Sequence, residues 1–268
     1  MRTRMHPILL LVFSIASSTL VLSQTASTGS DSFISNPVAD QDASPEDTVK
    51  TEVKSPAPRP YRKSTAVSAL NVIPTGDFGS TDISNGGFAK PGWGVSLESR
   101  NNLGHGFSFI SYSTYSWINL DTDAMEKAFT SSLQARTTVT GGQHRPFLTT
   151  LGLGKTVFKQ GNVQAGVSAM AGIMYNSFKA FQIKVFDDNN NVLFSDILKF
   201  DTDFEFTYLF GVDLNYYVIP EVLAIHLGGN YVTANLNTFL QSDHFEAIKV
   251  DGKMQMMNVN LGVIFNTN

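Results

Sequence analysis

The chain has no cysteine among its 268 residues. This absence excludes disulfides, thiolate metal sites and a lipidated N-terminal cysteine. The formal charge of −4 is mild, whereas binding of nucleic acid requires a concentrated basic patch. We therefore expect no nucleic-acid partner. The length is sufficient for one or two domains with a sizeable core.

Long apolar runs are also scarce, and the one that stands out is at the N-terminus. The stretch from Ile8 to Leu22 follows the basic "MRTRMHP" and precedes "QTAS". This pattern predicts a secretory signal peptide over residues 1–23 and hence export. The alternative is a membrane anchor helix, but the run is shorter than the ~20 apolar residues that a helical span needs.

The next segment, residues 24–63, lacks the composition of a folded domain. Its stretch "NPVADQDASPEDTVKTEVKSPAPRP" contains no aromatic residue and is rich in proline and charge. Such a segment buries too little apolar surface to offset its ordering entropy. We expect a disordered periplasmic linker.

From residue 64 onward, apolar and polar residues alternate, and "FEFTYLFGVDLNYYV" at 204–218 is the clearest case. A period of two indicates a strand with two unlike faces. Short links (101–104, 158–161 and 219–221) alternate with long ones, so all long loops fall at one end of an antiparallel sheet. The candidate strands are 64–73, 92–100, 105–118, 146–157, 162–176, 204–218, 222–236 and 254–265. The long loops hold a candidate helix at 121–135, a hairpin turning at Asp188–Asn190 and the exposed stretch 239–250.

The difference between the two faces of each strand predicts whether water or lipid surrounds the sheet. The interior of an eight-stranded barrel is so narrow that side chains fill it. Five aromatic side chains on one face of 204–218 would therefore not fit inside. In the strands at 162–176, 222–236 and 254–265, large apolar residues share one face, and small or polar residues share the other. We therefore expect large apolar residues to face lipid, where a closed barrel is the only sheet that can span. Residues 105–118 are apolar on both faces, so their orientation is left open. Trp93, Tyr175 and Tyr216 are candidates for the aromatic belts.

The sequence here resembles a known family. "LNVIPTGDFG" at 70–79 and "GGFAKPGWGVSLE" at 86–98 are similar to the first strand, loop and second strand of porin-like outer-membrane β-barrel proteins of Gram-negative bacteria. With the signal peptide and eight strands, residues 64–268 resemble the small barrels that include the OmpA transmembrane domain, OmpX and OmpW. The resemblance implies short periplasmic turns and long loops at the cell surface.

Signatures of catalysis and cofactor binding are missing. "LGLGKT" at 151–156 falls short of a phosphate loop, because Thr149 stands where that motif needs glycine. His105 and His144 are interpreted as solvated residues of a turn and a loop edge. His244 lies near Asp243 and Glu246, but spacing alone supplies no metal geometry. We predict no catalytic, cofactor or metal site and hence no enzyme.

Polar residues on the inward face are the remaining site candidates. We interpret them as ion pairs and hydrogen bonds that fill the lumen, because buried charges require such partners. The alternative is a narrow water-filled path or ligand site. The candidates are Glu98, Arg100, Glu205, Asp213, His226 and Asn230.

These observations predict an all-β, eight-stranded antiparallel up-and-down transmembrane β-barrel in the outer membrane. Its partners would be outer-membrane lipid and a surface ligand bound by the long loops. Its role would be structural, surface interaction or a narrow pore. The alternatives are a secreted lipocalin-like barrel that binds an apolar ligand and a barrel enzyme that acts on lipid.

Overall fold

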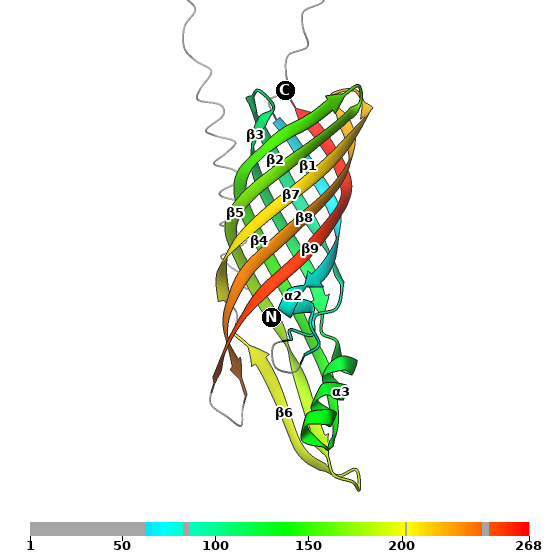
Figure 1. The fold of residues 1–268 in the computed structure, drawn as a ribbon, viewed down its shortest axis with the longest axis vertical. Coiled ribbons are helices and arrows are strands. Elements are labelled where there is room, and N and C mark those ends of the chain that lie inside the picture. The colour runs from blue at the N-terminus through cyan, green and yellow to red at the C-terminus, as the bar shows by residue number, and fades with distance from the viewer. Residues whose placement is uncertain (1–62, 83–85, 202, 243–246, 268) are drawn as a thin grey trace, which may run out of the picture. The chain divides into compact units, whose positions relative to one another are not determined.

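The computed structural model describes residues 63–82, 86–201, 203–242 and 247–267. The expected signal peptide and, apart from Lys63, the expected linker lie outside these residues. None of the helices in these ranges is long and apolar enough to cross a membrane. The elements, shown in Figure 1, are β1 (Lys63–Thr75), α2 (Gly76–Gly79), β2 (Gly92–Gly104), β3 (Phe107–Asn119), α3 (Thr122–Leu133), β4 (Arg136–Gln160), β5 (Val163–Phe186), β6 (Val192–Phe200), β7 (Asp203–Ile219), β8 (Leu223–Gln241) and β9 (Ile248–Thr267).

Eight of the strands close into a ring. Antiparallel pairing runs from β1 through β2, β3, β4, β5, β7, β8 and β9, and β9 pairs back with β1. The predicted eight-stranded barrel is therefore confirmed. β6 lies outside the ring and pairs with β5 and with two residues of β8. Closure pairs the backbone groups that an open sheet would leave at its edges.

The two ends of the barrel differ. One end, here called the turn end, carries the tight β2–β3, β4–β5 and β7–β8 connections together with Lys63 and Thr267. The other end, the loop end, carries α2, α3 and β6 (Figure 1). This is the alternation of short and long connections that the sequence predicts.

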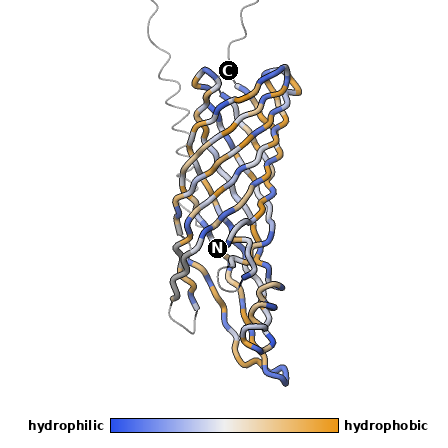
Figure 2. The backbone as a smooth tube through the Cα atoms, in the orientation of Figure 1, coloured by the Kyte–Doolittle hydropathy of each residue, from blue (hydrophilic) through white to orange (hydrophobic). Residues whose placement is uncertain are grey.

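The outer face of the barrel is apolar. Leu261 is 61% exposed while its neighbour Asn260 is 2% exposed, and hydrophobic and hydrophilic residues alternate along the strands in Figure 2. The apolar rows predicted for 204–218 and 254–265 all face outward, as a transmembrane barrel requires. The strand predicted at 105–118 begins at Phe107, and its orientation is clear in the structure. Its inward face carries Ile110, Tyr112 and Ile118, and its outer face carries Phe107, Phe109, Tyr115 and Trp117.

An aromatic belt marks where the outer face changes from apolar to polar at the loop end. Its members are consecutive in register: Trp93 pairs with Trp117, Tyr115 with Phe147, and Phe147 with Tyr175, which in turn pairs with Phe204. The Trp93 and Trp117 rings stack with centroids 4.2 Å apart. Aromatic residues concentrate at membrane–water interfaces, so the strand segments beyond this belt lie outside the hydrocarbon.

Several strands run well beyond the belt, which the sequence did not predict. β4 begins at Arg136 instead of residue 146, and β5 continues to Phe186 instead of ending at 176. Beyond the belt, water replaces lipid around the strands, so the apolar–polar alternation that marks them in the sequence is lost. The predicted helix and hairpin are both present, as α3 and as the β5–β6 pair with a turn at 187–191.

Candidate functional site: the lumen and the loop-end extension

An ion network crosses the turn-end half of the lumen. Arg100 of β2 donates from Nε to Glu98 on the same strand, and from Nη2 to Asp213 Oδ1 of β7 at 2.6 Å. Asn215 Nδ2 donates to Asp213 at 2.9 Å, and His226 Nδ1 donates to Asn215 Oδ1 at 2.8 Å. We call these five residues the luminal network. They connect β2 to β7 and β8 through side chains that lie inside the ring.

A second set of polar contacts lies beside this network. Tyr112 of β3 is buried, and its hydroxyl accepts hydrogen bonds from Asn230 at 3.1 Å and from Asn260 at 3.3 Å. The predicted lumen residue Asn230 is thus held against the opposite wall. Glu205 is also buried and inward, but it lies eight residues from Asp213 along β7, toward the loop end. The structure therefore brings five of the six sequence-predicted residues near one another and sets Glu205 apart.

The turn-end mouth of the barrel is a shallow polar cavity of about 300 Å³. Arg100 contributes to its wall, so the network lies at its inner side. Amide and hydroxyl side chains and two lysines make up most of the rest, including Ser64, Asn102, Gln164, Lys63 and Lys159.

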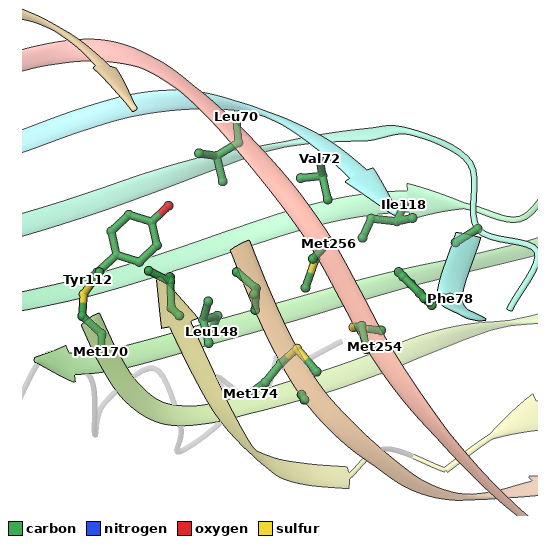
Figure 3. Packing of buried hydrophobic residues seen from close by; sticks show 14 of the residues in the cluster. Leu70, Val72, Phe78, Tyr112, Ile118, Leu148, Met170, Met174, Met254 and Met256 are labelled. Atoms are coloured by element: carbon green, nitrogen blue, oxygen red, sulfur yellow. The ribbon is translucent and has the colours of Figure 1, made fainter. Parts of the chain in front are cut away.

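The loop-end half of the lumen is mostly apolar, although Glu205 and Thr207 are also buried there, contrary to the expectation that small or polar residues line the whole interior. Four methionines and several branched side chains from seven strands fill it, and Figure 3 shows them converging between the strands. Phe78 of α2, 3% exposed, folds in over this layer from the loop end. We call this set the apolar layer. Its members include Leu70, Val72, Phe78, Ile118, Leu148, Met170, Met174, Leu209, Val232, Met254 and Met256.

His144 lies next to Phe78, three residues beyond the belt residue Phe147 on β4 and on the inward face. It is buried, not solvated as the sequence suggested. The Phe78 ring contacts it edge-on at 5.1 Å and the Phe178 ring at 4.7 Å. Asn176 Nδ2 donates to Nδ1 at 3.1 Å. Burial lowers the pKa of His144 to about 4, and the contact with Asn176 opposes this shift only in part, so the ring is neutral at pH 7.

Beyond the belt, an ordered structure projects from the barrel. This loop-end extension consists of α3, residues 136–145 of β4, residues 177–186 of β5, and β6. Its inner face holds a separate hydrophobic cluster. The cluster includes Phe88, Leu120, Met125, Val139, Phe181, Ile183 and Leu198.

Helix α3 covers the edge of the extension sheet. β3 ends at Asn119, so the start of β4 pairs with β5 on one side and, among the described residues, has no strand on the other side. There Glu126 Oε1 accepts the Val139 N–H at 2.8 Å, and Thr130 Oγ1 accepts the Thr137 N–H at 3.1 Å. Covering an edge in this way prevents uncontrolled strand pairing.

The start of α3 is itself anchored. Asp121 caps the helix by accepting the Ala124 N–H at 3.0 Å, and Lys90 lies 3.1 Å from its carboxylate. Burial alone would raise the pKa of Asp121, but the Ala124 bond and Lys90 outweigh it and hold the pKa below its ordinary value. Asp121 therefore stays ionised, and the cap holds, at all but strongly acidic pH.

Two glycines join barrel and extension in β4. Gly141 and Gly142 have φ values of +87° and +80°, a region that glycine adopts at little cost. A Cβ on Gly142 would lie 2.4 Å from Leu120 Cδ1. The strand pair bends here, so that Phe181 and Ile183 of β5 face α3.

Sequence reasoning found the polar residues of the lumen but missed the apolar layer, Phe78 and His144. "LGLGKT" at 151–156 lies within β4, in keeping with the strand pattern. Among the described residues no cluster of His, Cys, Asp or Glu could hold a metal ion; His244, Asp243 and Glu246 lie outside them. A signal for the layer does exist, since Met170, Met174, Met254 and Met256 occupy the inward rows.

Comparison with known proteins adds to the account of the fold. No family model and no curated protein matches the chain. Among solved structures it is similar to Ail, the attachment invasion locus protein of Yersinia pestis, at 10% identity and a TM-score of 0.42, covering 77% of this chain and 99% of that one. Neisserial surface protein A is similar at 11% identity and 0.42, covering 76% and 97%. The outer membrane protein OprG from Pseudomonas aeruginosa is similar at 10% identity and 0.42, covering 78% and 96%. These are structures to which the chain is similar; the predicted barrel fold is confirmed by the closed ring of eight strands itself.

Proposed function

We propose that this protein is an outer-membrane β-barrel of a Gram-negative bacterium that acts in surface recognition through its loop-end extension. The barrel anchors the extension, and the lumen carries no solute. The loop end faces outward from the cell, and the turn end faces the periplasm. The single observation that carries this proposal is the extension itself: it has its own hydrophobic cluster and a covered strand edge.

The side chains that fill the lumen favour a binding role over a pore. The luminal network and the apolar layer are stacked along the barrel, and each fills the interior with side chains from several strands. A solute would have to break both a set of buried ion pairs and a packed hydrophobic layer. We further propose that the protein is a binding protein and not an enzyme.

The secreted lipocalin-like alternative is not favoured. A soluble barrel needs a polar exterior, whereas the outward rows of β7 and β9 are large and apolar. Rigid scaffolds present binding residues on their loops, and the extension is the largest ordered structure at the loop end (Figure 1).

The proposal is tested by the sidedness of the protein in intact cells. An epitope inserted in the 187–191 turn should be labelled by antibody on intact cells, and the same epitope at Gly161–Asn162 should be labelled only after the cells are opened. The two insertions are matched, since both lie in turns between paired strands. Labelling of the 161–162 epitope alone on intact cells would reverse the orientation and overturn the proposal.

A further inference from the structure

Methionine side chains from two parts of the barrel wall converge in the loop-end half of the lumen. Met174 comes from β5, and Met254 and Met256 occupy alternate inward positions of β9. All three are buried members of the apolar layer, and Figure 3 shows them extending into the same part of the lumen. We call these three residues the thioether cluster. Because a thioether sulfur is polarisable as well as apolar, the cluster can do more than fill space.

The two strands that carry the thioether cluster are not neighbours in the ring. β7 and β8 lie between β5 and β9, so the methionine side chains meet across the interior and not along the wall. An eight-stranded interior is narrow enough for such a meeting. The wall between them carries short side chains at this level: Thr207 pairs with Ala234, and Ala234 pairs with Met254. These short side chains leave room for the longer methionines.

A buried carboxylate lies beside the thioether cluster. Glu205 of β7 pairs in register with Met174 of β5, and both residues face inward. Each of them is the chain neighbour of an aromatic belt residue, which places the pair at the loop-end boundary of the hydrocarbon. The Glu205 carboxylate brings one negative charge to a layer that is otherwise mostly apolar. Because a buried charge is stabilised by an opposite one, a cation bound beside Met174 would be balanced there.

The chemistry of these side chains indicates the kind of cation. Thioether ligands favour soft ions such as Cu(I), whereas carboxylates, carbonyls and water suit hard ions such as Mg²⁺ and Ca²⁺. The chain has no cysteine and hence no thiolate, so the three sulfur atoms of the cluster are neutral. A soft ion with a single positive charge would therefore be neutralised by the one carboxylate. A divalent ion would leave a positive charge buried in the apolar layer, which is costly.

We propose that the thioether cluster binds one soft monovalent metal ion of the Cu(I) class, with Met174, Met254 and Met256 as sulfur ligands and Glu205 as the balancing charge. Methionine has three rotatable side-chain bonds, so the sulfur atoms can turn toward the ion without a shift of the backbone. Phe78 covers the layer from the loop end, and an ion that enters from that end must first displace it. Such a site is independent of surface recognition and of the direction in which the barrel faces.

The test uses Ag(I) as the probe, because it is a soft monovalent ion like Cu(I) and needs no reductant. The full-length chain, refolded in neutral detergent and chloride-free buffer, is titrated with Ag(I). Native mass spectrometry counts the ions bound per chain. Thermal unfolding measures stabilisation, since an ion that binds only the native state raises the unfolding temperature. Ca²⁺ is the hard-ion control.

The decisive variant combines Met174→Leu, Met254→Leu and Met256→Leu, because leucine has a volume close to that of methionine and keeps the layer filled. Two single variants are matched controls. Met170→Leu changes a methionine of the same layer that lies four residues from Met174 along β5 and apart from the cluster in Figure 3. Met257→Leu changes an exposed methionine of the outer face of β9. A heat-dependent shift in gel mobility verifies that each variant is folded.

We expect the wild type to bind one Ag(I) per chain with a raised unfolding temperature, and the combined variant to lose both effects. Met170→Leu and Met257→Leu should keep both, and Glu205→Gln should weaken binding by about 10–100-fold, as the loss of a supporting group does at other metal sites. The proposal is overturned if the wild type binds no Ag(I), if the combined variant binds it as tightly, or if bound Ag(I) leaves the unfolding temperature unchanged. Equal stabilisation by Ca²⁺ would also overturn it, because the carboxylate and not the sulfur atoms would then select the ion.

Discussion

The two halves of the lumen are filled by opposite chemistry. Toward the turn end, Arg100 is held between Glu98 and Asp213, and hydrogen bonds continue to His226. Toward the loop end, the interior is an apolar layer closed by Phe78. The polar half pairs its charges within the barrel, and the apolar half packs as the core of a soluble domain does. Together they fill two successive parts of the interior with side chains of opposite chemistry.

The comparison also shows where each half is vulnerable. A buried ion pair contributes little net stability but is costly to break, because the remaining charge loses its partner. A packed apolar layer is sensitive to lost volume. Substitutions in the two halves should therefore fail for different reasons.

The largest effect is expected in the polar half. Arg100→Leu leaves the Glu98 and Asp213 carboxylates buried without their cation, and we expect a loss of about 3–5 kcal/mol in unfolding free energy. The measurement is urea unfolding in lipid vesicles. Adding Glu98→Gln and Asp213→Asn should restore most of the loss, since no buried charge then remains. If this triple variant is as unstable as Arg100→Leu, the packing of these side chains stabilises the network and their charge does not.

The apolar half should respond to volume. Leu209 is fully buried in the layer, and Leu209→Ala should cost about 2–5 kcal/mol through lost transfer free energy and a cavity. The matched control is Leu227→Ala on the outer face, where lipid tails fill the space and no cavity forms. Unfolding in the same vesicles gives both values. Equal costs would show that the interior is not packed to the density that we describe.

Acid should weaken the boundary between barrel and extension. His144 in the unfolded chain gains its proton near pH 6.5, but in the native protein burial lowers its pKa to about 4. Its contribution to stability is therefore complete above about pH 6.5 and is lost as the pH falls to 4, by up to about 3 kcal/mol.

The matched variant is His144→Gln, which removes the titrating group. The difference in unfolding free energy between pH 7.5 and pH 4 should be smaller in this variant than in the wild type by that amount. An unchanged difference would mean that the native ring gains its proton as readily as the unfolded one. The Phe78 contact would then not exclude water from it.

The sequence predicted the spanning part of the fold well because lipid and lumen impose unlike demands on alternate residues. Strand 204–218 could be assigned face by face, since large apolar residues suit only lipid when the interior is narrow. Glu98, Arg100 and Asp213 were found by the same alternation.

The apolar layer and the extension were harder to predict for physical reasons. In the layer, residues such as Ile110 and Ile118 are apolar on the inward face while Phe109 and Trp117 are apolar on the outward face, so alternation carries no information. In the extension, β4 and β5 lie outside the membrane, so neither face contacts lipid. The ends of these two strands depend on tertiary partners such as α3. His144 was misplaced because its burial comes from Phe78 and Phe178, both distant in sequence.

The central claim is that side chains close the lumen to solutes and that the loop-end extension carries surface recognition. The most direct measurement is ionic current through single refolded barrels in a planar bilayer. We expect no steady open-channel current from the wild type at neutral pH. Steady currents whose ion preference changes in Asp213→Asn or Glu205→Gln would contradict the account, because they would show that ions pass both the network and the apolar layer.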